Sequence, residues 1–258
     1  IVPGTPDEIG FLRHVLAIFN RADIPLGVFD MNTKSIVSAF DYKVYYSTEI
    51  KESRAASDAC DILLTHCDEN TILVCVGPLT NVSKAIQTGK FRLGRLVVQG
   101  GFAGDNIVPS NKRIDKLNGQ LTSTAFNLDS NVQSALNVLQ DKTIKEKFFV
   151  SKNVCHRVHY NRDMHKQLEP IKDKSLSLKE IYRIMSIYLD SINIDGEIFH
   201  DPLTACCAID PTIGEWRDVE LYFDEQVKEW GSRIVEYPNV KITVDYNHSS
   251  FLNTLFAY

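Results

Sequence analysis

Residues 71–81 read TILVCVGPLTN, and this stretch decides the fold class. It opens on a short, mostly apolar run, which is typical of a parallel strand that is buried on both faces. A turn that contains glycine and proline follows, and Val82, Ala85 and Ile86 then have the spacing of an amphipathic helix. A strand, a turn and a helix in this order predict one β-α unit of an α/β sheet.

The same alternation continues along the chain on both sides of this unit. Residues 95–99 and 147–154 are further predicted strands, whereas residues 31–50 have no clear period and we expect a loop there. Predicted helices cover residues 7–21, 56–66, 82–89, 132–139 and 248–256. We therefore predict an α/β fold with a doubly wound, mainly parallel sheet, in which residues 71–76 and 95–99 are neighbours or near-neighbours.

The C-terminal part of the chain has a different pattern, in which short strands follow one another without long helices. Residues 219–223, 232–237 and 240–245 are the predicted strands. They predict an antiparallel extension of the sheet near the C-terminus.

Polar residues that could carry chemistry lie beyond the carboxyl ends of the predicted strands, where α/β sheets bind ligands. Val76 and Gln99 end two of these strands, so the turns after them should line a site. The sequence HDP at residues 200–202 adds an Asp that we expect to cap a helix before Pro202. Such a carboxylate can hold a hard cation, and the His beside it can transfer protons near neutral pH. The alternative is a plain capping Asp next to a surface His.

The composition limits the classes of function. The chain has 258 residues, of which 44% are hydrophobic and 24% charged, as in a soluble globular protein. Its net charge of -5 argues against a nucleic-acid partner, and no apolar run approaches the roughly 20 residues of a membrane span. The 6 cysteines lack the spacing of a zinc site, so we expect reduced core residues in a cytoplasmic protein.

Four short motifs follow one another in the chain: GPLTN at residues 77–81, GG at 100–101 leading to Asn106, FN at 126–127, and HDP at 200–202. In this order, and with these strand and helix contexts, the chain resembles the nucleoside hydrolases from near residue 10 to its C-terminus. The resemblance implies one domain over residues 1–258 that hydrolyses the N-glycosidic bond of ribonucleosides to free base and ribose. It also implies a Ca²⁺ cofactor, which holds the attacking water, and a homo-oligomer.

The resemblance implies roles for five residues. Asp201 matches the family's late metal carboxylate, and the main-chain carbonyl of Val76 matches another Ca²⁺ ligand. Asn106 and Asn127 match the amides that bind the sugar, and His200 matches a residue proposed to protonate the leaving base. The alternative for each Asn is a turn residue that bonds its own backbone, and for His200 a partly buried His that the backbone satisfies.

The Asp-rich first strand and turn of the family, D-x-D-P-G-x-D-D, does not occur in this chain, and Ala125 stands where the family has a Glu. That motif supplies two metal carboxylates and the general base. In the family, a strand like Ile1-Val2 and the helix after it follow the motif, so we expect residue 1 to align about one β-α unit inside the family domain. Three hypotheses stay open: an upstream segment supplies the motif, another chain supplies it, or the protein is a degenerate relative. In the third case we expect a nucleoside-binding or structural and interaction subunit without catalysis.

Overall fold

The computed structural model describes residues 5–29, 45–46 and 49–257, so most of the loop expected over residues 31–50 lies outside the described residues. The chain divides into two compact units. One, here called the sheet unit, comprises Cys67–Asn161 and Gly196–Tyr258, and the other, the helical unit, comprises Ile1–His66 and Arg162–Asp195. The expectation of a single domain stays a prediction.

A seven-stranded sheet forms the centre of the sheet unit, in the order β3-β4-β6-β11-β9-β10-β5. Its strands are β3 (Ile72–Cys75), β4 (Leu93–Gln99), β5 (Thr122–Ser123), β6 (Ile144–Val150), β9 (Gly214–Asp224), β10 (Glu229–Arg233) and β11 (Val240–Tyr246). Neighbours from β3 to β11 are parallel, and those from β11 to β5 are antiparallel. The structure therefore confirms the α/β class, the pairing of β3 with β4 and the antiparallel extension.

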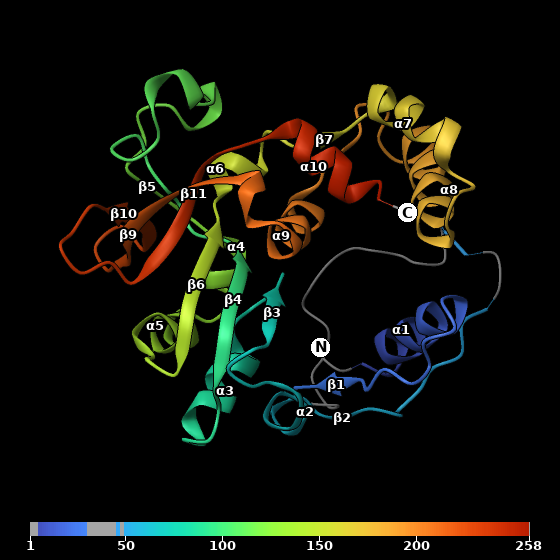
Figure 1. Cartoon of the computed structure of the whole chain (residues 1–258), viewed down its shortest axis with the longest axis horizontal. Coiled ribbons are helices and arrows are strands. Elements are labelled where there is room, and N and C mark those ends of the chain that lie inside the picture. The colour runs from blue at the N-terminus through green and yellow to red at the C-terminus, as the bar shows by residue number, and fades with distance from the viewer. Residues whose placement is uncertain (1–4, 30–44, 47–48, 258) are drawn as a thin grey trace. The chain divides into compact units, whose positions relative to one another are not determined.

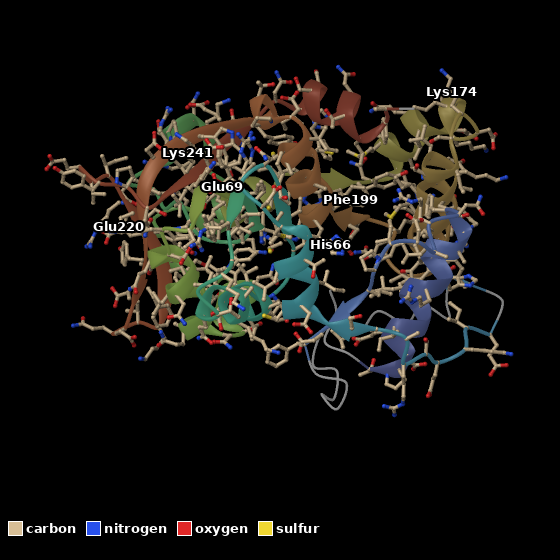
Figure 2. All side chains as sticks on the ribbon, turned by 60° about the horizontal axis from the view of Figure 1, so that its bottom comes forward. His66, Glu69, Lys174, Phe199, Glu220 and Lys241 are labelled. Carbon is tan, nitrogen blue, oxygen red and sulfur yellow. The ribbon has the colours of Figure 1, made fainter. Side chains whose placement is uncertain are left out.

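Ion pairs join neighbouring strands of the antiparallel extension. Glu220 of β9 pairs with Arg233 of β10 at 2.5 Å, and Lys241 of β11 pairs with Asp218 of β9 at 2.8 Å. Glu220 and Lys241 are labelled in Figure 2. Opposite charges in register across two strands contribute only modestly at an exposed surface, so these pairs support the register more than the stability.

The expectation that the strand after residue 71 is buried on both faces is wrong. Ile72 is 48% exposed and Val74 is 38% exposed, because β3 is the edge strand of the sheet in the sheet unit. An apolar run gives the same pattern at the edge and in the middle of a sheet, since burial depends on the neighbours that the strand acquires.

Helices α3 (Thr80–Gln87) and α5 (Val132–Gln140) pack against each other in the sheet unit. Helix α9 (His200–Ile209) contacts β3, β4 and β6, and α10 (His248–Leu255) packs on α9. Figure 1 shows α9 and the short α6 (Lys152–Cys155) near the arrowhead ends of the parallel strands. The remaining elements of this unit are α4 (Phe126–Asp129), η2 (Ser110–Lys112), η3 (Asp115–Leu117), η5 (Pro211–Ile213), β7 (His159–Tyr160) and β8 (Glu197–Ile198).

The strand predicted over residues 147–154 ends four residues earlier, at Val150. Ser151 stops it, because its side chain accepts a hydrogen bond from the Val154 amide and caps α6. After β4, Gly101 allows an abrupt turn: its φ is +80°, and an added Cβ would lie 3.2 Å from Leu221. Both turns bring the chain over the carboxyl edge of the sheet.

The helical unit contains α1 (Pro6–Ile18), β1 (Gly27–Val28), β2 (Ser57–Asp58), α2 (Ala59–His66), α7 (Arg162–Leu168), η4 (Glu169–Ile171) and α8 (Leu176–Ser191). Thr5 and Glu8 form a reciprocal capping box at the start of α1. Helices α7 and α8 pack together, with the rings of His165 and Tyr182 stacked 4.1 Å apart. None of the helices in the described part of the chain has the length and apolar character that crossing a membrane requires.

Candidate functional site

Three segments meet at the carboxyl edge of the parallel strands. Cys75 pairs in register with Val98, so Val76 stands level with Gln99 at the ends of β3 and β4. The start of α9 lies near the same edge, because the charge of Asp201 acts on Cys155, whose Sγ contacts Gln99 at the end of β4. Asp201 does not cap α9 as we expected. The helix begins at His200, Phe199 occupies the capping position without a side-chain bond, and the acid stands in the first turn.

Phe199 anchors the start of α9 in the core of the sheet unit. Its side chain is buried, and its ring lies 4.7 Å from the ring of Tyr160 (Phe199 is labelled in Figure 2). Its amide donates a 2.7 Å hydrogen bond to the carbonyl of Val158. An apolar anchor at this position explains why the two polar residues that follow it are held at the edge of the sheet.

The carboxyl group of Asp201 has neither a hydrogen bond nor an ion pair with any described residue. The residue is exposed at the surface, yet the protein that surrounds the carboxyl group raises its pKa to about 6. The two observations agree for a group that faces solvent from crowded surroundings. In the first turn of a helix a carboxylate is favoured by the helix dipole. Asp201 is thus an ionisable group near neutral pH that a cation or a developing positive charge would stabilise.

A chain of hydrogen bonds leads from Asn127 toward Asp201. Asn127 is buried, and its Nδ2 donates to Gln99 Oε1 at 2.6 Å and to the Gln99 carbonyl at 3.1 Å. Gln99 Nε2 in turn lies 3.7 Å from Cys155 Sγ. The charge of Asp201 contributes, after burial, to the raised pKa of Cys155, so these groups are close. Both amide hydrogens of Asn127 are engaged, which leaves its Oδ1 to accept from a ligand.

Cys155 and His156 are adjacent in the sequence and could suggest a nucleophile pair, but the structure does not support one. They lie at the end of α6 and not in a strand, where adjacent side chains would point to opposite faces. The thiol is fully buried, and burial raises its pKa to about 12. Cys155 therefore stays protonated at neutral pH, and a thiol is a weak nucleophile.

His156 connects the start of α9 to the loop that precedes β5. Its ring lies 5.3 Å from the ring of His200 in an edge-to-face arrangement. On the other side its Nδ1 lies 3.5 Å from Lys116 Nζ. Burial lowers the pKa of His156 to about 4, and the positive charge of Lys116 adds to this effect. Burial also lowers the pKa of His200, so both imidazoles are mainly neutral at pH 7.

Asn106 occupies a different place from the other candidates. Its Nδ2 donates a 2.7 Å hydrogen bond to the carbonyl of Ser232 in β10, and no hydrogen bond joins it to the described residues around Asp201. The structure thus brings Val76, Asn127, His200 and Asp201 to the ends of β3 and β4, and ties Asn106 to the antiparallel extension. Sequence reasoning missed Cys155, His156 and Lys116 as neighbours of this group, whereas Gln99 was recognisable as a polar strand end.

The described residues fit a Ca²⁺ ion only in part. Asp201 offers a carboxylate without a partner, and the main chain of Val76 offers a carbonyl at the end of β3. However, Ca²⁺ requires six to eight oxygen ligands. No three His, Cys, Asp or Glu side chains gather as a metal site within residues 5–29, 45–46 and 49–257. We therefore assign no reaction step to the ion.

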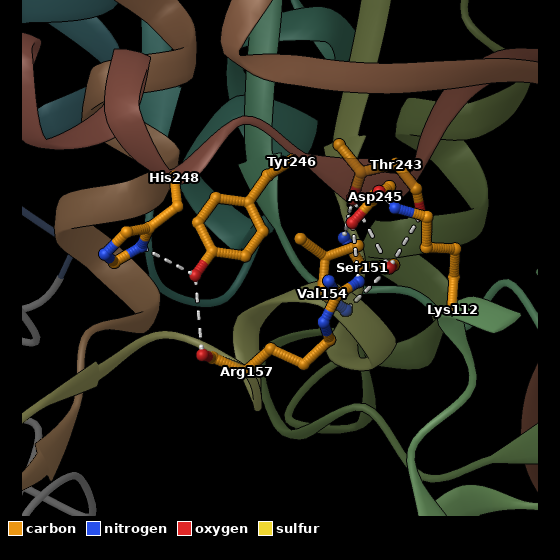
Figure 3. A network of polar contacts seen from close by, with 8 residues as sticks. All are labelled: Lys112, Ser151, Val154, Arg157, Thr243, Asp245, Tyr246 and His248. Carbon is orange, nitrogen blue, oxygen red and sulfur yellow. Dashed lines mark hydrogen bonds and ion pairs between the residues drawn. The ribbon is translucent and has the colours of Figure 1, made fainter.

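A buried carboxylate joins three segments of the sheet unit near α6 (Figure 3). Asp245, near the end of β11, pairs with Arg157 at 2.6 Å and also with Lys112 of η2. Nearby, Ser151 donates two hydrogen bonds of 2.8 Å to Thr243, one from its amide to Oγ1 and one from its Oγ to the carbonyl. The Asp245 pairs thus connect β11, η2 and the segment that carries His156, so they hold this segment in place beside the candidate site.

Asp245→Asn should destabilise the protein by about 2–3 kcal/mol, measured by urea unfolding at pH 7. Removing one partner of a buried ion pair leaves the other charge uncompensated. The loss falls at the lower end of the usual range, since Arg157 and Lys112 keep 26% and 36% of their side-chain surface exposed. Asp218→Asn, which removes an exposed pair on the neighbouring strand, should cost less than about 1 kcal/mol. Equal effects would contradict the role of Asp245.

The same carboxylate gives stability a pH dependence of known sign. Burial alone would raise the pKa of Asp245, but hydrogen bonds from Lys112, the Tyr246 amide and Arg157 outweigh it and lower the pKa below 3.8. The stabilisation is present above the unfolded value and is lost as pH falls through the folded value. The difference in unfolding free energy between the wild type and Asp245→Asn should therefore shrink below about pH 4.

Comparison with known proteins finds one matching family model and similar solved structures. The family model described as inosine-uridine preferring nucleoside hydrolase matches residues 13–253. A plant nucleoside hydrolase, the PpNRh1 enzyme, has a similar structure, with 19% identity, a TM-score of 0.69, and coverage of 99% of this chain and 87% of that one. A purine-preferring ribonucleoside hydrolase from Gardnerella vaginalis has 15% identity and a TM-score of 0.67, over 94% of this chain and 81% of that one.

A third similar structure is an inosine-uridine preferring nucleoside hydrolase from Bacillus anthracis. Its identity is 19% and its TM-score 0.65, over 96% of this chain and 83% of that one. No curated protein matches the chain. At these identities the likeness to solved structures shows the fold, whereas the family model covers most of the chain.

Proposed function

The chain belongs to the inosine-uridine preferring nucleoside hydrolase family, and from this premise we propose that it hydrolyses the N-glycosidic bond of ribonucleosides. In this reaction the bond between C1′ of ribose and the base nitrogen breaks. The oxygen of one water molecule bonds to C1′, one of its protons goes to the leaving base, and the products are ribose and free base. Positive charge develops on the sugar as the base departs.

Each candidate residue has a part in this reaction that its surroundings support. Asn127 Oδ1 has no hydrogen-bond partner among the described residues, so it can accept a hydrogen bond from a ribose hydroxyl. The Asp201 carboxylate stabilises the developing positive charge of the sugar. His200 can hand a proton to the leaving base as a general acid. The proposal also gives Asn106 a part in binding the sugar, although its Nδ2 donates to the Ser232 carbonyl and no hydrogen bond joins it to the described residues around Asp201.

Calcium is part of the proposal as a cofactor. Asp201 and the Val76 carbonyl would be two of its ligands, and further oxygens are needed to complete its coordination. When bound, Ca²⁺ supplies a site for ribose hydroxyls and lowers the pKa of a coordinated water. The partner we propose is a ribonucleoside.

The observation that carries this proposal is the carboxyl group of Asp201. It has no partner among the described residues, stands at the carboxyl edge of parallel strands, and has its pKa raised to about 6 by burial. A carboxyl group with a raised pKa and without a partner is a candidate for a site where a ligand supplies the opposite charge. Its place beside an imidazole and a buried amide fits a polar sugar better than an apolar ligand.

The proposal predicts release of hypoxanthine from inosine and of uracil from uridine by the full-length protein. Base release should be measured by chromatography with 1 mM Ca²⁺ and with a chelator in its place, at about physiological ionic strength. We expect turnover with Ca²⁺ that drops at least about tenfold with the chelator, because a lost ligand-binding ion removes both positioning and charge. No base release from either nucleoside in the presence of Ca²⁺ would contradict the proposal.

A second candidate function is a nucleoside-binding or interaction subunit without hydrolysis. The solvent-accessible Asp201 and the missing metal cluster among the described residues favour it. It predicts that uridine binds, as measured by calorimetry, and that no uracil is released over hours of incubation. Detection of uracil in proportion to protein concentration would exclude it.

A further inference from the structure

A second group of polar side chains lies next to the candidate site and has no part in the reaction described above. Lys116 lies in η3. Lys152 is the first residue of α6, and His156 directly follows its last residue. Residues four apart on a helical turn lie on the same side of it. Lys116 Nζ reaches His156 Nδ1 at 3.5 Å, so two distant segments converge here. These three residues are called the basic cluster below.

Neither ammonium group of the basic cluster forms an ion pair with a residue in the described ranges, although Asp129 and Glu229 lie near enough to Lys152 to raise its pKa. Burial lowers the pKa of Lys152, the positive charge of Lys116 lowers it further, and the carboxylates of Asp129 and Glu229 do not offset these effects. Lys116 has no ion pair with any residue in the described ranges. By contrast, the neighbouring bases are matched: Lys112 and Arg157 pair with Asp245, and Arg113 pairs with Asp105. Among these bases, ammonium groups without an ion pair are therefore found in the basic cluster.

The hydrogen-bonding roles in the basic cluster are fixed by chemistry. An ammonium group only donates, so His156 must accept at Nδ1 and carry its hydrogen on Nε2. All three side chains then offer donors to a ligand: two ammonium groups and one imidazole N–H. Lys152 is also held in place, since its Nζ donates to Ser123 Oγ at 2.9 Å and to the Thr124 carbonyl at 3.1 Å. A set of fixed donors with surplus positive charge favours an anion.

We propose that the basic cluster binds the phosphate of a 5′-phosphorylated ribonucleoside, so that nucleoside 5′-monophosphates are substrates. The inference rests on the proposed hydrolysis of ribonucleosides. The ring of His156 lies 5.3 Å from that of His200, so the anion would sit beside the sugar. The base occupies C1′, and Asn127 and Asp201 take ribose hydroxyls, which leaves the 5′ carbon as the position for a charged substituent.

With this substrate the same bond breaks as in the hydrolysis of a ribonucleoside. One water molecule and a nucleoside 5′-monophosphate give the free base and ribose 5-phosphate, and only the bond from C1′ to the base nitrogen breaks. The phosphate ester stays intact, so the basic cluster contributes binding and orientation. A dianionic phosphate matches two ammonium groups in charge, whereas a carboxylate would leave one of them uncompensated.

Binding of ribose 5-phosphate and of ribose, measured by calorimetry, tests the inference without turnover. We expect the wild-type protein to bind ribose 5-phosphate at least about tenfold more tightly than ribose, since one charge-assisted contact is worth that factor. Lys116→Glu should remove most of this preference and leave ribose binding unchanged. Lys116 is exposed, so the variant should fold. Lys142→Glu is the matched control, with the same change of charge on an exposed Lys before the amino end of β6.

Three outcomes decide between the proposals. Equal affinities for ribose and ribose 5-phosphate in the wild type, or equal losses in Lys116→Glu and Lys142→Glu, would overturn the phosphate site. Release of uracil from uridine with no preference for uridine 5′-monophosphate would overturn the phosphate site and keep the hydrolase. Binding of inorganic phosphate that depends on Lys116, in a protein that releases no base, would support the anion site and overturn the hydrolase.

Discussion

Asp201→Asn should lower kcat/KM for inosine and uridine by at least about 10³-fold in the full-length protein, because the carboxylate stabilises charge that appears only in the transition state. The substitution keeps the size of the side chain and removes its charge. Calcium binding, followed by calorimetry, should weaken in the same variant, since an amide is a poorer ligand for a hard cation than a carboxylate. Retention of activity within about tenfold would contradict the role assigned to this residue.

A measurement of stability distinguishes the loss of activity in Asp201→Asn from unfolding of the variant. The folded pKa of Asp201 is about 6, above the ordinary value of 3.8, so its ionised form destabilises the fold at neutral pH. Asn removes that cost, and partial exposure of the residue reduces the gain to about 1 kcal/mol or less. Asp201→Asn should therefore unfold at the same or a higher urea concentration than the wild type. Functional sites often hold such destabilising groups.

Asp210→Asn is the matched control for Asp201→Asn. Asp210 stands at the other end of α9, where its Oδ1 accepts from the Thr212 amide at 2.9 Å. An Asn at this position keeps an oxygen that can accept the same bond. Equal losses of activity in the two variants would show that any change of charge on α9 impairs the protein.

The strands of the parallel half of the sheet were predictable, because a short apolar run in a chain of this composition usually forms a strand. The structure places β3 and β4 side by side as the β-α unit required. What the pattern could not show is that β3 lies at an edge, because exposure of Ile72 and Val74 depends on partners that come from elsewhere in the fold. Similarly, the strand ending at Val150 looked longer because the apolar Val154 follows it, whereas the polar residues 151–153 in fact open α6.

The parts of the candidate site that come from neighbouring residues in the sequence were predictable. The contacts between residues that are distant in the sequence were not. The HDP stretch and the end of β4 are visible as polar residues after apolar ones. In contrast, the contact of Lys116 with His156 joins residues 40 positions apart, and that of Gln99 with Cys155 joins residues 56 apart. Neither pair has a local signature, since loop closure over such distances leaves no spacing rule in the sequence. The resemblance to the family indicated residues for the reaction of that family, and it gave no indication of the basic cluster.

His200→Ala should lower kcat for inosine by about 10²–10⁴-fold, the usual contribution of a proton-transfer group, while calcium binding stays unchanged. His200 contacts His156 edge to face, and burial lowers its pKa, so the small protonated fraction at pH 7 is a strong acid toward the leaving base. His159→Ala is the control, because His159 is exposed on β7 and pairs with Ile198 just before α9. Its kcat should stay within about threefold of the wild type.

The nature of the leaving group distinguishes a proton donor from a residue that merely shapes the site. With p-nitrophenyl riboside the leaving group departs as a stable anion and needs no proton. His200→Ala should therefore hydrolyse this substrate nearly as fast as the wild type, whereas Asp201→Asn should be slow on both substrates, since the sugar develops positive charge in either case. Equal losses on inosine and on the nitrophenyl riboside in His200→Ala would assign His200 to positioning, through its contact with His156, and would remove it from the proton transfer.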